Sequence, residues 1–209
     1  KAGIKEKIKE ILEKIDFEDT AQLDSSTKEI RELIINSKIP QEMETEIIES
    51  YDNLNVKQAS GSALDILKSE QDFVFVAVRS SATAEDLATA SFAGQQDSFV
   101  NVRGNFSLLE HIKKCFASLF TSRATYYRNK KGFEHEKVSL AVVVQQMVDS
   151  DKSGVIFSKD PSYKNNNTII EAVFGLGEGI VSGKISPDRY VVSNELEILD
   201  KKIANKKIA

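Results

Sequence analysis

An apolar run that ends in an arginine is the part of the sequence best suited to bind a charged ligand. Residues 73–78 read Phe-Val-Phe-Val-Ala-Val, and Arg79 and two serines follow directly. A buried strand that ends here would hold a planar guanidinium and hydroxyl donors at one point. Gly94 carries no side chain and lets backbone N–H groups approach a ligand. These groups can hold a polyphosphate; the alternative is a structural ion pair of Arg79 with Glu85 or Asp86.

A second segment, residues 138–148, has the features of an adenine-binding strand. An adenine ring needs an apolar slot and a backbone donor and acceptor for its polar edge, which a strand that leaves a sheet can offer. Met147 would add a soft, adaptable wall. We expect a central strand whose C-terminal end opens onto a cleft shared with Arg79. The alternative is an ordinary core strand.

Two glutamates lie in or near an apolar segment, and their roles stay open. Glu171 is alone in the apolar run 168–174, so its burial would require a partner such as Arg79 or a metal-bound phosphate. The glycines of residues 174–179 lack the Gly-Lys-Ser/Thr of a phosphate loop and the spacing of a dinucleotide fold. They predict a strand-to-helix turn with Glu178 near the helix start.

The histidines and the single cysteine give little support for a metal site. His111 and Cys115 are four residues apart on a predicted helix, a spacing that could place two ligands on one face. No further cysteine or histidine completes such a set, since His135 lies in a separate charged connector. We therefore expect Cys115 to pack in the core and assign no metal ligand in this sequence.

The first seventy residues are predicted to be helical and to carry no chemistry. Apolar residues from Ile4 to Ile15 recur with the period of a helix. Ser26 and Glu29 have the spacing of a capping box, which predicts that a second helix begins there. Pro40 suits the first turn of a third helix. The abundant Lys and Glu are interpreted as solvated helix faces.

After residue 70 the composition changes to short apolar runs. They predict strands near residues 73–79, 97–102, 138–148, 153–158, 168–174 and 189–192. One long helix interrupts them, with a capping box at Ser107 and Glu110 and a core face from Leu109 to Phe120. This order indicates an α+β fold. We expect a helical subdomain at residues 1–70 and an α+β subdomain at residues 71–209.

Composition limits the class of protein. With 209 residues the chain can bury a proper core, and its net charge of −4 argues against a nucleic-acid partner. No apolar run reaches the ~20 residues of a membrane helix, so no membrane partner is expected. The sequence opens in an amphipathic helix rather than a signal peptide. Its single cysteine suits a reducing, cytoplasmic environment.

Several blocks of the sequence resemble one known family in order and spacing. They are residues 117–128, 144–148, 153–158, 174–178 and 181–188, together with the segment around Arg79. The chain resembles the nucleotide-binding domains of phosphoenolpyruvate synthase, pyruvate phosphate dikinase and rifampicin phosphotransferase, which have an ATP-grasp fold. The resemblance is close over residues 70–192 and looser over the preceding helices.

This resemblance implies a binding site for ATP and Mg²⁺. Arg79 inherits the role of phosphate clamp and catalytic cation, because its fork can bind two phosphate oxygens and stabilise charge on the transferred group. The nucleotide-binding positions that match the family are Arg79, Gly94, Ser98, Gln145, Met147 and Val148. No magnesium ligand of the family falls within this sequence.

The resemblance also implies a reaction. A phosphoenolpyruvate synthase transfers a phosphoryl group from ATP through a phosphohistidine domain of the same polypeptide to pyruvate, giving phosphoenolpyruvate, AMP and phosphate. The family's nucleotide-binding lysine, acidic magnesium ligand and phosphohistidine domain lie outside this sequence, so we expect a fragment that is inactive alone. The alternatives are a rifampicin phosphotransferase, a pyruvate phosphate dikinase, or a non-catalytic nucleotide sensor with the same fold.

Overall fold

The chain forms a mixed α and β structure made of two compact units. The computed structural model describes residues 3–56, 73–82, 86–87, 90–91, 97–162 and 166–205. Residue contacts divide the chain into Lys1–Met147 and Val148–Ala209. The subdomain boundary expected at residue 70 falls within residues 57–72, outside the described residues. The α+β class predicted from the order of the elements is confirmed.

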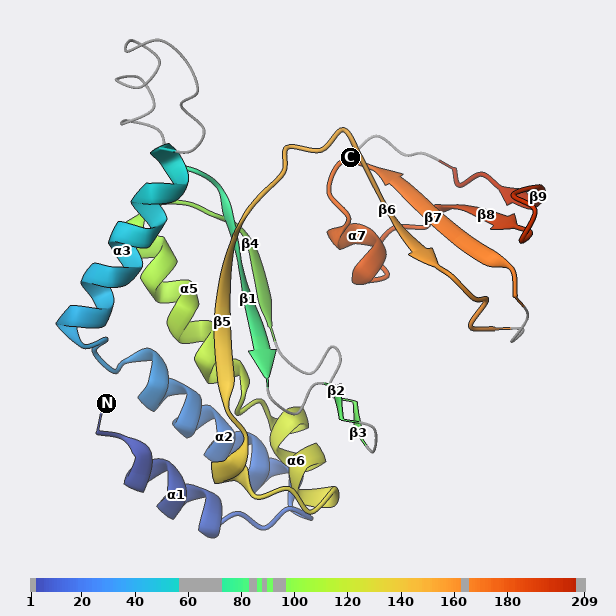
Figure 1. Cartoon of the computed structure of the whole chain (residues 1–209). Coiled ribbons are helices and arrows are strands. Elements are labelled where there is room, and N and C mark those ends of the chain that lie inside the picture. The colour runs from blue at the N-terminus through green and yellow to red at the C-terminus, as the bar shows by residue number, and fades with distance from the viewer. Residues whose placement is uncertain are drawn as a thin grey trace. The chain divides into compact units, whose positions relative to one another are not determined.

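The first unit contains a helical layer and a three-stranded antiparallel sheet with the strand order β4-β1-β5 (Figure 1). Its helices are α1 (Lys5–Glu13), α2 (Thr20–Ile35), α3 (Gln41–Val56), α5 (Asn105–Ser118), α6 (Ser122–Lys130) and the 3-10 helix η1 (His135–Lys137). Its strands are β1 (Val76–Ala82), β2 (Asp86–Leu87), β3 (Ala90–Ser91), β4 (Ser98–Val102) and β5 (Leu140–Gln146). The short strands β2 and β3 pair with each other.

Two helix starts differ from the sequence prediction. Helix α2 begins at Thr20, where the Asp19 carboxylate accepts hydrogen bonds from the amides of Ala21 and Gln22. The predicted start at Ser26 is wrong, because that residue lies inside the helix. The start predicted at Ser107 is wrong for the same reason: α5 begins at Asn105. A capping-box spacing also occurs by chance within helices, so it does not locate a helix end unaided.

The predicted long helix is two helices. Helix α5 ends at Ser118 and α6 begins at Ser122, where the Thr121 hydroxyl accepts from the amide of Ala124. Of the predicted core face, Ile112, Leu119 and Phe120 are buried, whereas Leu109 is only half-buried and Phe116 is exposed. The apolar residues buried on α5 are Leu108, Ile112, Cys115 and Ala117. The prediction that Cys115 packs in the core is confirmed, and burial raises the pKa of its thiol to about 11.

Helix α5 holds the unit together, since it packs on all three strands and also contacts α2 and α3. Figure 1 shows these helices on one face of the sheet. Val76 and Val78 of β1 are fully buried beneath them, and Val142 and Val144 of β5 pack on the same core. Alternation along the strands therefore directs every second side chain of β1 and β5 to the opposite face.

Two predictions about the strands of this sheet need correction. β1 extends from Val76 to Ala82, so Arg79 lies in the middle of the strand and not at its end. The ladder continues past the apolar run because Ala82 still pairs with Leu140. The central strand is β1, whereas β5 pairs with β1 alone among the described strands. β5 is apolar because helices pack on one of its faces, and not because a described strand pairs with each of its two edges.

The second unit is a four-stranded antiparallel sheet with the strand order β6-β7-β8-β9 and one short helix. Its elements are β6 (Lys152–Phe157), β7 (Thr168–Phe174), α7 (Glu178–Val181), β8 (Asp188–Val192) and β9 (Ile198–Lys202). A Cβ at Gly154 would lie 2.6 Å from the Glu171 carbonyl oxygen. Glycine is therefore required where β6 approaches β7.

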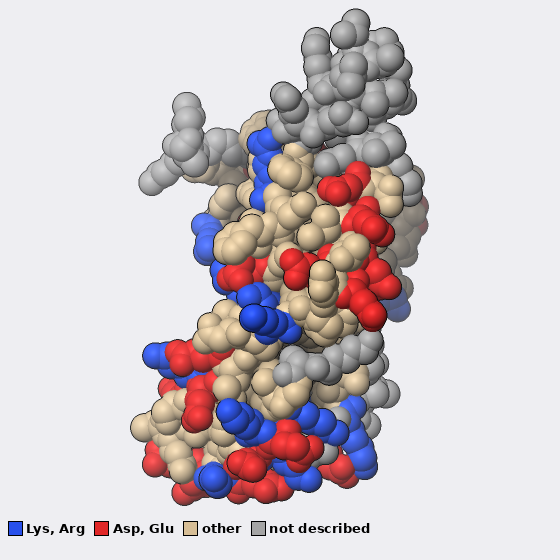
Figure 2. Space-filling model, turned by 90° about the vertical axis from the view of Figure 1, so that its left-hand side faces the viewer, with Lys and Arg blue, Asp and Glu red and all other residues tan. Residues whose placement is uncertain are grey.

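Figure 2 shows acidic and basic side chains interspersed over the lower part of the surface and a group of acidic side chains at mid-height on the right. Exposed side chains form ion pairs between Lys28 and Glu32 of α2 and between Lys130 and Glu18. The interpretation of these charges as solvated helix faces agrees with this view. Among the described residues, no helix has the length and apolar character needed to cross a membrane.

Candidate functional site on the open face of the first sheet

The face of the first sheet that the helices leave uncovered carries most of the predicted site residues. Arg79 pairs with Ser98 on one side and with Val143 on the other. Residues directly opposite each other in an antiparallel pair point to the same face, with Cβ atoms roughly 5 Å apart. Arg79, Ser98, Val143 and Gln145 are all exposed. We call this surface the open face.

Arg79 offers its charge to solvent rather than to a neighbouring acid. No carboxylate whose side chain the structure describes forms an ion pair with it. The alternative partners Glu85 and Asp86 lie outside the described side chains. An exposed guanidinium beside the Ser98 hydroxyl presents several N–H donors and one O–H donor to the same region, which suits a phosphate or carboxylate ligand.

The other end of the open face is organised around Met147. Its amide donates to the Phe75 carbonyl at 2.9 Å, so strand pairing continues one residue beyond β5. This amide is therefore occupied and cannot be the backbone donor expected for an adenine edge. The Met147 sulfur accepts a hydrogen bond from the Asn101 amide at 3.0 Å. Because β1 lies between β4 and β5, the Met147 side chain reaches across β1.

Val148, the next residue, remains available for that role. Its side chain is 76% exposed. Its backbone makes no hydrogen bond to a residue that the structure describes. Since it is the first residue of the second unit, only its place in the chain relates it to the open face. Gly94 lies outside the described residues.

The open face thus brings together Arg79, Ser98 and Gln145, with Met147 at one end. Met147, the residue after β5, is four positions from Val143, the partner of Arg79, which corresponds to about 13 Å at the rise of a strand. The predicted base-binding and phosphate-binding ends therefore lie on one face of one sheet, separated by a distance comparable to the length of ATP.

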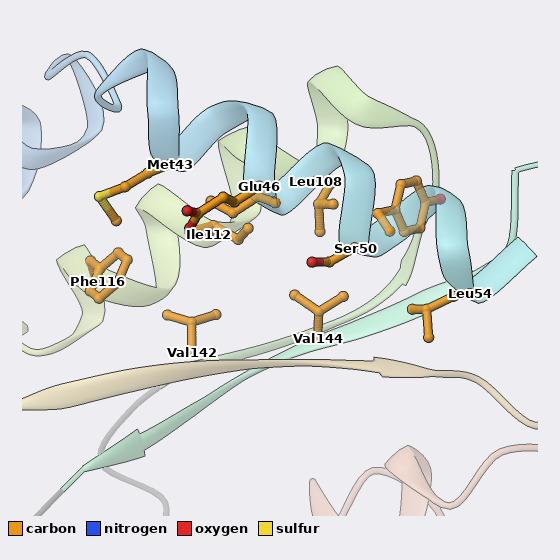
Figure 3. A pocket seen from close by; sticks show the side chains of 11 residues that line it. Met43, Glu46, Ser50, Leu54, Leu108, Ile112, Phe116, Val142 and Val144 are labelled. Carbon is orange, nitrogen blue, oxygen red and sulfur yellow. The ribbon is translucent and has the colours of Figure 1, made fainter.

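A cavity of about 440 Å³ lies on the opposite, helix-covered face (Figure 3). Val142 and Val144 point into it from β5, below side chains of α3 and α5. Of the described residues that line it, Glu46 is the only charged one. A mostly apolar lining whose one charge is acidic would repel a polyphosphate, so this cavity does not suit the ligand that the open face suits.

The two glutamates whose roles were open belong to the second unit. Glu171 is half-buried in β7 and pairs with Arg189 of β8 across the sheet. This register offers it a basic neighbour within its own unit. Glu178 begins α7 after Gly175, whose φ of +71° makes the turn out of β7. The predicted strand-to-helix turn is confirmed.

A buried arginine and a histidine form a separate polar cluster on the helix side of the first unit. Arg128 is 1% exposed, and its Nε donates to Nδ1 of His135 at 3.2 Å. Burial, followed by the charge of Arg128, lowers the pKa of His135 to about 4. Burial lowers the pKa of Arg128 to about 10. Within the described part of the chain, no group of three or more His, Cys, Asp and Glu residues could hold a metal ion.

The sequence prediction missed one pair of residues on the open face. The Arg103 guanidinium lies over the Phe75 ring, with its central carbon 5.3 Å from the ring centroid. Phe75 is exposed, whereas Val74 and Val76 on either side of it are buried. The available signal in the sequence was strict alternation of side chains within residues 73–78, which places every second side chain on the same face. Because the whole run is apolar, its composition does not show which of the two faces is exposed.

Comparison with known proteins gives the family. The whole chain, residues 1–209, matches the family described as pyruvate phosphate dikinase, AMP/ATP-binding domain. It is 48% identical over 206 residues to a probable phosphoenolpyruvate synthase of Methanocaldococcus jannaschii, covering 98% of this chain and 16% of that protein. It is 51% identical over 208 residues to a probable phosphoenolpyruvate synthase of Archaeoglobus fulgidus, covering 99% of this chain and 26% of that protein.

A third relative carries a different name. The chain is 44% identical over 194 residues to a rifampicin phosphotransferase of Bacillus cereus, covering 92% of this chain and 20% of that protein. The chain thus spans between 16% and 26% of the length of these relatives. By its full-length match, this chain belongs to the family of pyruvate phosphate dikinase AMP/ATP-binding domains.

Proposed function

We propose that this chain forms the ATP-binding part of a phosphoenolpyruvate synthase. The observation that carries the proposal is the exposed Arg79 on the open face, directly opposite Ser98 and without a carboxylate partner among the described side chains. The family and the names of its relatives support the choice of ligand. We further propose that the fold is an ATP-grasp fold.

Arg79 and Ser98 would hold the phosphates, and the Met147 end would hold the base. The Arg79 fork binds two phosphate oxygens and stabilises the charge that develops as the terminal phosphoryl group leaves. Gln145 supplies an amide on the same face, and Val148 supplies the backbone groups for the adenine edge. Gly94 retains its proposed role in a loop over the phosphates. Catalysis of phosphoryl transfer requires mainly this positioning of the phosphates and this stabilisation of their charge.

The acceptor of the phosphoryl group would come from other parts of the polypeptide. Nδ1 of His111 is hydrogen bonded to the Ser107 carbonyl at 2.7 Å, and Nδ1 of His135 accepts from Arg128. Both histidines therefore have structural roles, which favours a phosphohistidine outside this chain. Pyruvate would likewise bind elsewhere. Mg²⁺ would neutralise the phosphates, and no ligand for it is assigned to a described residue.

The test is an assay of the full-length polypeptide with ATP, Mg²⁺ and pyruvate. We expect formation of phosphoenolpyruvate with release of AMP and phosphate. We also expect the protein to act in the cytoplasm. The rifampicin phosphotransferase relative makes a second function worth testing in parallel. AMP release that depends on rifampicin instead of pyruvate would establish that alternative. ATP binding without AMP release under either condition would indicate a nucleotide sensor.

A further inference from the structure

A buried tyrosine joins two backbone segments at the base-binding end of the open face. Tyr51 of α3 is 1% exposed. Its hydroxyl donates to the Val74 carbonyl at 2.6 Å and accepts from the Gly104 amide at 3.0 Å. Burial raises the pKa of the phenol, so the hydroxyl keeps its proton and can donate and accept at the same time.

The two residues next to these contacts are the stacked pair on the open face. Phe75 follows Val74, and Arg103 precedes Gly104. Gly104 has a φ of +82°, a conformation that favours glycine, and it is the N-cap residue of α5, two residues after the end of β4. The Tyr51 hydroxyl thus fixes the backbone on both sides of the 5.3 Å contact between the Arg103 guanidinium and the Phe75 ring.

This pair lies at the correct distance from the proposed phosphate clamp. Phe75 directly precedes β1 and is four positions from Arg79, roughly 13 Å at the rise of a strand, and alternation places both on the open face. Met147 is fixed beside Phe75 by its amide hydrogen bond. An aromatic ring, a planar guanidinium and a thioether therefore meet where the base of a nucleotide would end.

We propose that Phe75 and Arg103 form the wall on which the nucleotide base stacks, and that Tyr51 is a positioning residue for this wall. The inference rests on the proposed function of the open face. Aromatic rings and guanidinium planes both stack on bases, and a base gains affinity from such a surface without base-specific hydrogen bonds. The wall would therefore contribute affinity for the base, and binding of the phosphates would depend on Arg79.

The test uses the full-length polypeptide with two probes, ATP and inorganic tripolyphosphate, which carries phosphates without a base. Phe75→Leu and Arg103→Lys should each weaken ATP binding on the order of tenfold and leave tripolyphosphate binding unchanged. Lysine keeps the charge of Arg103 but lacks the plane that stacks. Tyr51→Phe removes only the hydroxyl and should cause a several-fold loss for ATP alone.

Two controls separate the wall from the rest of the site. Phe106→Leu changes an exposed phenylalanine in the first turn of α5 and should affect neither probe. Arg79→Ala should weaken both probes. Unchanged tripolyphosphate binding in the wall variants also shows that they remain folded.

The outcomes distinguish the wall from the proposed function. ATP binding that is unchanged in both Phe75→Leu and Arg103→Lys would overturn the wall and leave the proposed function standing. Equal losses for ATP and tripolyphosphate in Arg103→Lys would place that residue on the phosphates, again against the wall. A loss of both probes in Tyr51→Phe would make Tyr51 a residue of general stability. A wild-type protein that binds neither probe would refute the proposed function and the wall together.

Discussion

The two faces of the β4-β1-β5 sheet are built by the same strands and have opposite chemistry. One face buries Val76 and Val78 beneath α5, and the other exposes Arg79 and Ser98 to solvent. Because side chains alternate along a strand, the register that buries the valines is also the register that presents the arginine. A slip of one residue would exchange the two sets and bury an unpaired cation. Burial on one face therefore positions the candidate site on the other.

The largest expected effect is a loss of phosphoryl transfer when the open face is altered, with little change in the stability that the covered face provides. Arg79→Ala should lower the rate of phosphoryl transfer on the order of 10²–10³-fold, since one oriented cation at the developing charge is lost. Its thermal unfolding should change little, because the side chain is exposed and makes no ion pair with a described carboxylate. Initial rates of AMP release, together with unfolding temperatures, measure both quantities.

Two companion variants make this result specific. Arg79→Lys should restore little activity, because a point charge cannot replace the planar fork. Arg123→Ala, an exposed arginine of α6, should leave the rate unchanged. An Arg79→Ala protein that unfolds yet keeps its activity per folded molecule would instead assign the residue to structure.

The next effect concerns the helix side, where pH should alter stability. The pKa of His135 is lowered from its ordinary value of 6.5 to about 4, so the unfolded chain binds a proton more readily than the folded chain. The resulting stability is present above pH 6.5 and is lost as pH falls toward 4. The loss amounts to at most about 3 kcal/mol, at about 1.4 kcal/mol per pKa unit.

Urea unfolding between pH 7 and pH 4 tests this prediction against a matched variant. His135→Gln keeps an acceptor for Arg128 but does not titrate in this range, so its unfolding free energy should fall less steeply with acid. Carboxylates titrate in both proteins and cancel in the difference. Parallel curves for the two proteins would show that His135 does not contribute to acid sensitivity.

A smaller effect compares two valines on opposite faces of the sheet. Val78→Ala removes two buried methyl groups and should destabilise the chain by about 2 kcal/mol. Val143→Ala, whose side chain is 46% exposed on the open face, should cost roughly 0.5 kcal/mol or less. Unfolding midpoints in urea measure the difference. Equal costs would mean that the open face is covered in the folded protein.

The sequence predicted the existence of most elements better than their ends and neighbours. The run 168–174 is a strand with these bounds, because six of its seven positions are apolar or β-branched and leave little choice. The start of α2 was misplaced because Asp19 and Gln22 have the same capping spacing as Ser26 and Glu29, so spacing alone does not choose between them. The start of α5 was misplaced because its N-cap, Gly104, makes no side-chain capping hydrogen bond. That β5 pairs with β1 alone among the described strands could not be predicted, since an apolar strand covered by helices resembles one that is paired on both sides.

For the candidate site, residue types were predictable and their contacts were not. Arg79 was identified by its place after an apolar run, and the family resemblance supplied Ser98 and Gln145. That Ser98 lies opposite Arg79 depends on the pairing of β4 with β1 across a register shift. That the Met147 amide is occupied depends on one hydrogen bond to Phe75. Both facts are set by tertiary pairing, which local patterns do not encode.

The most direct test of the central claim is a structure of the full-length polypeptide with Mg²⁺ and a non-hydrolysable ATP analogue. We expect the nucleotide on the open face, with the Arg79 guanidinium within hydrogen-bonding distance of phosphate oxygens and the base toward Met147. A nucleotide bound in the cavity lined by Val142 and Val144, or an Arg79 side chain that pairs with a carboxylate instead of phosphate, would contradict it.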